Sequence, residues 1–104
     1  MGAKQREVRE MKEQQRSMAR TQAREKGVPE HMIDGFVGYV IDRTPPGDFM
    51  FAVLSNNLRD SFACADERNR HAMFDIVNFL YNDVPGRCWG SPEAVEAWVD
   101  GGER

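Results

Sequence analysis

The sequence predicts an all-α protein, a compact bundle of three to four short helices with a long, basic, solvated N-terminal helix. Apolar residues recur at three- and four-residue spacing through most of the 104-residue chain. No stretch alternates apolar and polar residues between hairpin turns, which argues against a substantial sheet. A chain of this length forms one small core without staples. We divide it into a basic helical arm, residues 1–27, and a helical body, residues 28–104.

The arm contains good helix formers and no proline before Gly27, which is suited to the position just past a helix end. The only apolar seam at helical spacing consists of Val8, Met11 and Met18, interrupted by glutamines. Three apolar residues are few for folding onto a core. We therefore expect a projecting helix that pairs weakly with a partner helix or frays when alone.

The net charge of −3 conceals two regions of opposite sign. Residues 1–26 hold eight basic and four acidic residues, a balance of +4, whereas the rest holds six basic and 13 acidic residues, a balance of −7. One interpretation is attraction between arm and body, within one chain or between copies. The other is an arm that contacts nucleic acid or an acidic protein surface, with Arg9, Arg16 and Arg20 among the contacts.

The first body helix follows Pro29, which suits a first helical turn, and ends before the Thr44-Pro45-Pro46-Gly47 stop. Its apolar residues fall on one broad side, so the helix is amphipathic. Gly35 and Gly38 interrupt it, either to admit a close neighbour or with no role at all.

A second helix is expected from an Asp48 cap to about Ala65. Its core side would carry Met50, Phe51, Leu54, Leu58, Phe62 and Ala65. Asn56 and Asn57 would begin a second, mixed side, covered either by another helix of this chain or by a different molecule.

A third helix is expected from an Asp66 cap to Val84. Its core side would carry Met73, Ile76, Val77, Leu80 and Val84, flanked by Phe74 and Tyr81. The opposite side carries a polar stripe, which is either a solvated face or a partner surface: Arg68, His71, Asp75, Asn78 and Asn82, with Arg70 nearby.

The last short helix begins at Ser91-Pro92-Glu93, with serine as cap and proline in the first turn, and is expected to dock through Val95, Trp98 and Val99. Trp89 lies in the preceding turn. It is either a lid over the core or an exposed anchor for a partner.

The sequence offers no catalytic, cofactor or metal site, and we expect a protein that is not an enzyme. Cys64 and Cys88 lack zinc-site spacing and are expected to be reduced, buried, small apolar side chains. No glycine-rich phosphate loop or nucleophile turn is present. No apolar run is long enough to span a bilayer and no signal peptide is apparent, so we expect no membrane association and a cytoplasmic location.

The stretches PPGDF, AVLSNNL, ADERNRHAMFD, NFLYNDVP and CWGSPEAVEAW carry a resemblance. Over about residues 28–98 the body resembles small accessory proteins encoded by tailed phages and prophages. The resemblance brings no assigned activity or cofactor. It implies a setting, an infected or lysogenic bacterial cell, in which such products often act by binding host proteins.

Three functional hypotheses follow. The first is a non-enzymatic factor that binds a host protein, including inhibition of a defence system such as CRISPR, with self-association also plausible. The second is an oligomer that sequesters a small ligand or nucleotide in a pocket lined by Arg68, Arg70, His71 or Arg87. The third is nucleic-acid binding through residues 1–26. The expected partner contacts are Arg9, Arg16, Arg20, Asn56, Asn57, Arg68, Arg70, His71, Asp75, Asn78, Asn82 and Trp89.

Overall fold

The computed structural model describes the backbone of residues 2–101 and the side chains of residues 6–101. Throughout that range the protein is helical and no strand occurs, which confirms the predicted fold class. The elements are α1 (Gly2–Lys26), α2 (Glu30–Asp42), α3 (Asp48–Leu54), α4 (Leu58–Cys64), α5 (Glu67–His71), α6 (Met73–Asp83), the 3₁₀ turn η1 (Gly86–Cys88) and α7 (Pro92–Val99).

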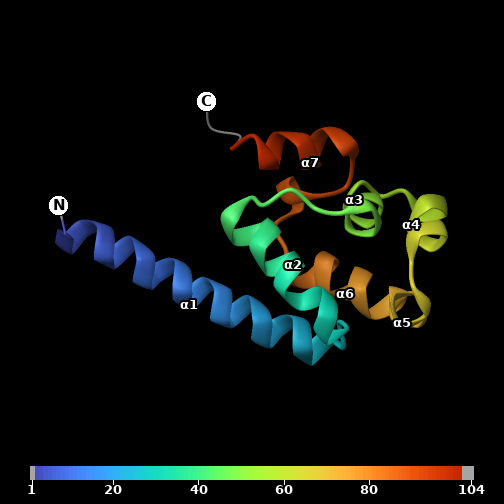
Figure 1. The fold of residues 1–104 in the computed structure, drawn as a ribbon, viewed down its shortest axis with the longest axis horizontal. Helices are drawn as coiled ribbons and strands as arrows, with labels where there is room; N and C mark the ends of the chain where they lie inside the picture. Colours follow the sequence, from blue (N-terminus) through green and yellow to red (C-terminus); the bar gives the residue numbers. More distant parts are fainter. Residues whose placement is uncertain (1, 102–104) are drawn as a thin grey trace.

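Helix α1 projects beyond the body at its N-terminal end, and its C-terminal half packs against α2 and α6 (Figure 1). Ala23 is completely buried in the core and Ala19 packs against it. The apolar seam of Val8, Met11 and Met18 remains exposed. The arm therefore attaches through small side chains on a different side of the helix from the seam.

The core gathers buried side chains from α1, α2, α3, α6, η1 and α7. The rings of Phe36 and Phe79 meet edge to face with centroids 6.0 Å apart. Gly35 on α2 admits the side chain of Met50 from α3, because a Cβ at Gly35 would lie 2.7 Å from the Met50 terminal methyl carbon. The close-neighbour interpretation of Gly35 is thus confirmed.

Helix α7 is held at the end of α2 by Trp98, as expected. The Trp98 indole Nε1 donates to the carbonyl oxygen of Tyr39 at 2.9 Å, and the Arg43 guanidinium carbon lies 3.7 Å from the centre of a Trp98 ring. Arg43 has a φ of 59°, which ends α2 in the left-handed conformation.

The prediction of one continuous helix from Asp48 to about Ala65 is wrong, because the helix is interrupted at Ser55-Asn56-Asn57. Asn56 takes a φ of 62°, and the Asn57 side-chain oxygen accepts from the backbone N–H of Asp60 at 3.0 Å. The triplet therefore ends α3 and caps α4. The cap expected at Asp48 falls instead on Gly47, without a side-chain hydrogen bond.

This break turns α4 away from the expected orientation. Leu58 and Phe62, expected in the core, are exposed, while Ser61 and Ala65 are buried. Cys64 is exposed, contrary to expectation, whereas Cys88 is buried as expected, and both are free thiols.

The expected helix from Asp66 to Val84 is also interrupted, at Ala72, between α5 and α6. The Asp66 cap is confirmed, since its Oδ1 accepts from the Asn69 backbone N–H at 2.7 Å. The flanking positions expected for Phe74 and Tyr81 are wrong, because the buried side of α6 is centred on Ile76, Phe79 and Leu80.

Candidate functional site: the outer face of α6

The outer face of α6 comprises Phe74, Val77 and Tyr81. These side chains are 79%, 39% and 78% exposed. Their spacing of three and four residues places them on one side of the helix. Two aromatic side chains left this open on one helix form an apolar surface of the kind that marks an interaction site.

The local sequence accounts for this face, since α6 is apolar on two sides and the core covers only one of them. Ile76, Phe79 and Leu80 are at most 1% exposed and belong to the core, where Phe79 meets Phe36 of α2. At about 100° per residue, Phe74 and Tyr81 lie roughly 160° and 140° from Ile76 on the helical wheel. Helical periodicity alone did not distinguish the two sides.

The polar stripe forms the flank of this face, and the structure divides it. Asp75 lies against Gly27 at the end of α1, since a Cβ on Gly27 would be 2.7 Å from Asp75 Oδ2. Asn82 Nδ2 donates to Asn78 Oδ1 at 2.6 Å and to the Asn78 carbonyl oxygen at 2.9 Å. His71 is highly exposed, with its Nε2 3.8 Å from Glu67 Oε2. The amide part of the stripe therefore borders the aromatic face.

The other expected contacts lie apart from this face. Arg68 and Arg70 are exposed on α5, where Arg70 Nη2 donates to the Ala65 carbonyl oxygen at 3.4 Å. Trp89 is half-buried against the core, in the position of a lid. The Arg87 guanidinium carbon lies 5.6 Å from the centre of a Trp98 ring. Asn56 and Asn57 are exposed at the α3–α4 break.

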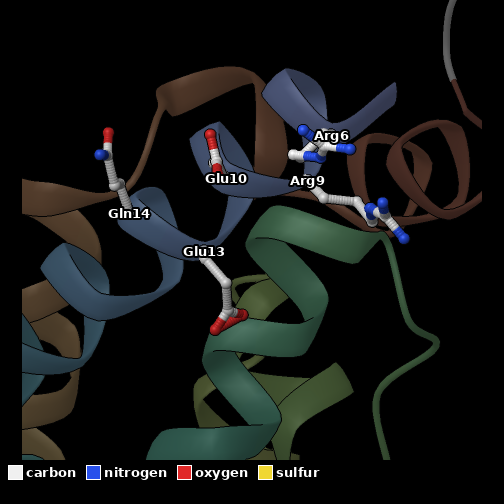
Figure 2. A pocket seen from close by; sticks show the side chains of 5 residues that line it. All are labelled: Arg6, Arg9, Glu10, Glu13 and Gln14. Atoms are coloured by element: carbon white, nitrogen blue, oxygen red, sulfur yellow. The ribbon is translucent and has the colours of Figure 1, made fainter. Parts of the chain in front are cut away.

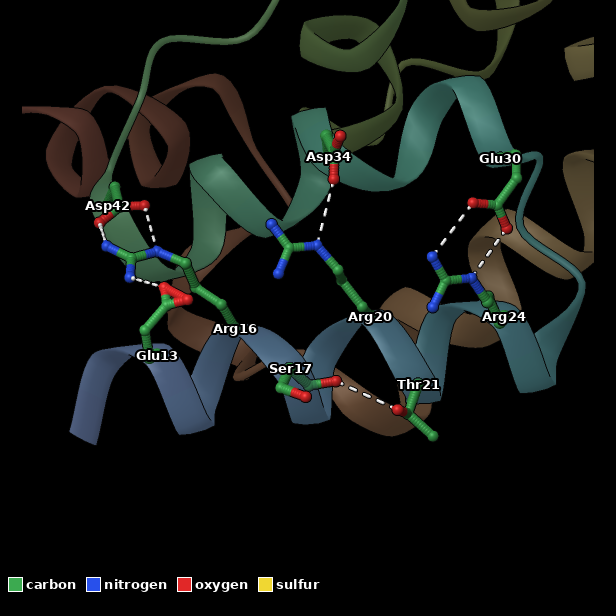
Figure 3. A network of polar contacts seen from close by, with 9 residues as sticks. All are labelled: Glu13, Arg16, Ser17, Arg20, Thr21, Arg24, Glu30, Asp34 and Asp42. Atoms are coloured by element: carbon green, nitrogen blue, oxygen red, sulfur yellow. Dashed lines mark hydrogen bonds and ion pairs between the residues drawn. The ribbon is translucent and has the colours of Figure 1, made fainter. Parts of the chain in front are cut away.

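Three arginines in the C-terminal half of the arm pair with carboxylates of the body (Figure 3). Arg16 Nη2 lies 2.6 Å from Asp42 Oδ1, and Arg20 and Arg24 pair with Asp34 and Glu30 at 3.2 and 2.9 Å. The hydrogen bond between these two side chains raises the pKa of the Arg16 guanidinium and lowers the pKa of the Asp42 carboxyl. These three arginines of the arm therefore neutralise carboxylates in the body of the same chain. This agrees with the interpretation of the charge asymmetry as attraction between arm and body within one chain. The Lys4 side chain lies outside the described residues.

A recess of about 560 Å³ is lined by Arg9 and four neighbours that belong to the same helix, α1. Figure 2 shows these five side chains pointing in different directions, with Glu13 turned towards α2. Because one helix supplies the entire lining, the recess is an open surface along the projecting part of α1. It places Arg9 on that surface beside acidic neighbours.

The buried titratable groups are held neutral. Burial raises the pKa of Tyr39 to about 12 and that of the Cys88 thiol to about 11. Tyr39 Oη donates to the Cys88 carbonyl oxygen at 2.6 Å. Cys88 is therefore a poor nucleophile in the folded protein, since the thiolate is the reactive form.

Among residues 6–101 no three histidine, cysteine or acidic side chains are placed to hold a metal ion. Within the described part of the chain, no helix combines the length and apolarity needed to cross a membrane. Compared with protein-family models, curated proteins and solved structures, the chain matches none of them.

Proposed function

We propose that this chain is a non-enzymatic binding protein that captures a partner protein on the outer face of α6. The observation that carries the proposal is the exposure of Phe74 and Tyr81, at 79% and 78%. Aromatic side chains are the commonest anchors of protein interfaces, and each removes roughly 150–250 Å² from water when fully covered. Because 79% and 78% of these side chains are still exposed, covering both corresponds to about 6–10 kcal/mol of gross apolar burial at roughly 25 cal/mol per Å², before the cost of association.

The side chains of this face indicate what kind of surface the partner should present. An apolar strip bordered by the amides of Asn78 and Asn82 matches the usual arrangement of an interface, with an apolar centre and a hydrogen-bonding rim. The partner should present apolar side chains at its centre and polar groups where they meet the amides. The Tyr81 hydroxyl is available at the edge of the strip, since the side chain is largely exposed.

The resemblance to phage and prophage accessory proteins supports a partner from the bacterial host, and the bacterial cytoplasm as the place of binding. A component of a defence system is one such partner, and blocking it would require complex formation without turnover. The pairing of Arg16, Arg20 and Arg24 with body carboxylates favours this proposal over nucleic-acid binding through the arm.

The test compares three baits in a bacterial lysate, with retained proteins identified by mass spectrometry. They are the wild type, Phe74→Ser/Tyr81→Ser and the matched control Leu58→Ser/Phe62→Ser, which removes exposed apolar side chains from α4 instead. We expect one protein to be retained by the wild type and the control but lost from the α6 variant. Both variants should melt like the wild type, since they alter exposed positions.

The partner identified in this way is then purified and titrated into the same three proteins. Equal affinity of the wild type and the α6 variant would show that the face is not the binding site. Turnover of any partner by the wild type would contradict the non-enzymatic role.

A further inference from the structure

Helix α1 carries an exposed apolar seam that the fold does not use. Val8, Met11 and Met18 are 51%, 58% and 63% exposed. Figure 1 shows the N-terminal end of α1 extending beyond the body, where it is accessible to another molecule. The seam and its flanking charges therefore indicate what could cover this side of the helix.

The seam has the spacing of a coiled coil. Val8, Met11, Gln15 and Met18 are separated by three, four and three residues, so they occupy successive a and d positions of a heptad repeat. A β-branched residue at an a position favours two strands, and a single polar residue at another a position fixes the register. Two Gln15 amides can hydrogen-bond to each other, since each has donors and an acceptor. The seam thus fits a pair of helices in register.

The charges beside the seam make it complementary to a parallel copy of itself. In a parallel pair, the g residue of one helix faces the next e residue of the other. Glu7 is at a g position and Lys12 is at the e position five residues later, and both are exposed. Glu7 of each copy would therefore face Lys12 of the other, and the twofold axis makes this contact twice.

The same residues disfavour an antiparallel pair. The antiparallel register that covers the apolar seam places Val8 opposite Met18 and Met11 opposite Gln15. In that register the e positions of the two helices face each other, so Lys12 lies opposite Lys12 of the second copy. Facing like charges oppose the pairing.

The body leaves room for the parallel pair. The α1 side chains that contact the body are Ala19, Ala23, Arg16 and Arg20. At about 100° per residue, these are centred roughly 110° around the helix from the seam. The two bodies would therefore lie on opposite sides of the paired helices, each turned away from the twofold axis.

We propose that α1 forms a parallel, two-stranded coiled coil with α1 of a second copy of this chain. Pairing covers the apolar seam of both copies and brings Glu7 of each to Lys12 of the other. The seam spans less than two heptads, from Val8 to Met18, so the association is weak and depends on protein concentration. This surface is separate from the outer face of α6 and does not depend on the function proposed there.

The test traps the pair with a disulfide. Met11→Cys places a thiol at the centre of the seam, and the matched control Glu10→Cys places one at an outward c position. Both variants carry Cys64→Ser, because Cys64 is exposed whereas Cys88 is buried. In a glutathione redox buffer, the thiolate of one copy attacks oxidised glutathione, the thiolate of the other displaces the second glutathione, and two reduced glutathiones leave for each protein disulfide.

The amount of linked dimer at equilibrium is measured by intact-protein mass. At equal protein concentration, we expect about tenfold more linked dimer from Met11→Cys than from Glu10→Cys, because pairing raises the effective concentration of the thiols. A mixture of Met11→Cys with Gln15→Cys should give mainly the two homodimers, since a parallel pair in register keeps these positions apart.

Charge reversal tests the choice of a second copy. In the Met11→Cys background, Glu7→Lys and Lys12→Glu should each lower the linked dimer several-fold, because each replaces two attractive contacts with two repulsive ones. The double reversal Glu7→Lys/Lys12→Glu should restore it. The same reversals in the Glu10→Cys background correct for any change in the chemistry of the thiol.

Four results would overturn the proposal. Linked dimer from Met11→Cys no greater than from Glu10→Cys would exclude the pair, and a predominant link between Met11→Cys and Gln15→Cys would assign an antiparallel one. Failure of the double reversal to restore the dimer would show that Glu7 and Lys12 do not face each other. If a lysate protein is lost from Val8→Ser/Met18→Ser and the Met11→Cys dimer is not enriched, the seam binds that protein instead.

Discussion

Lys26 Nζ lies 2.8 Å from Asp83 Oδ2 and joins the last turn of α1 to the last turn of α6, 57 residues further along the chain. The Asp83 side chain is only 12% exposed, so this is a more buried carboxylate than those that pair with Arg16, Arg20 and Arg24. The contact fixes the end of the arm on the body, where small side chains supply little apolar area.

Lys26→Met should destabilise the protein by about 1–3 kcal/mol, because it leaves the Asp83 carboxylate without its partner in a partly buried site. Urea unfolding followed by circular dichroism measures the change. The double variant Lys26→Met/Asp83→Asn should recover part of the loss. Arg20→Met is the matched control and should change stability by less than about 0.5 kcal/mol, because the Asp34 side chain is 86% exposed. Equal losses in the two single variants would contradict this explanation.

Asn57→Ala should destabilise the protein by about 1 kcal/mol, because the Asn57 side chain caps α4. Asn57→Ser retains an acceptor and should be close to the wild type. Thermal unfolding measures both.

Asn56 provides a separate test of the break between α3 and α4. Asn56→Gly should be neutral or slightly stabilising and Asn56→Ala should cost about 1 kcal/mol, since the φ of 62° suits glycine and not alanine. If Asn56→Ala were as stable as Asn56→Gly, a continuous helix through this triplet would be the better description.

Much of the fold followed from local sequence signals. Pro29, the Asp66 and Ser91 caps and the Pro45-Pro46-Gly47 stop act within a few residues of themselves, and each marks a helix end that the structure contains. The break at Asn56 was missed because asparagine tolerates both helical and left-handed conformations. Which of the two conformations Asn56 adopts depends on how α3 and α4 pack, and that packing cannot be judged from the neighbouring sequence.

The candidate site could be predicted only in part. The polar stripe of α6 was visible as a periodic pattern, and its amides do border the exposed face. Val77 was assigned to the core side, with Phe74 and Tyr81 at its flanks, because α6 carries apolar residues on two sides and periodicity gives no preference between them. Which side of α6 is buried depends on where α1 packs against it. Helix α1 attaches through Ala19 and Ala23, which have no strong hydrophobic signal in the sequence.

The protein should lose stability as the pH falls, through carboxylates whose pKa is lowered in the folded state. The Asn69 backbone N–H lowers the pKa of Asp66, and Arg16 does so for Asp42. A carboxylate with a lowered folded pKa stabilises the protein above its unfolded pKa, about 3.9 for aspartate, and loses that contribution as the pH falls through the folded pKa. The urea concentration at the unfolding midpoint should therefore decrease as the pH is lowered below about 4.

Asp66→Asn isolates one of these groups, because asparagine keeps the capping oxygen but removes the charge that faces His31 Nε2 at 3.2 Å. The variant should be less stable than the wild type near neutral pH, and the two urea midpoints should converge as Asp66 becomes protonated. A difference that stays constant down to about pH 2.5 would show that the charge of Asp66 contributes nothing.

Gly27→Ala should be among the most damaging single substitutions at a surface position. Gly27 has a φ of +89° between α1 and α2, and a Cβ there would lie 2.7 Å from Asp75 Oδ2. The left-handed conformation alone costs alanine about 1–2 kcal/mol, and displacement of Asp75 adds to it. Gly86→Ala is the matched control, since a Cβ there meets nothing within 4 Å, and it should be neutral or slightly stabilising. Gly27→Ala/Asp75→Ala should recover only the steric part of the loss. Full recovery in that double variant, measured by urea unfolding, would show that the backbone conformation of Gly27 carries no cost.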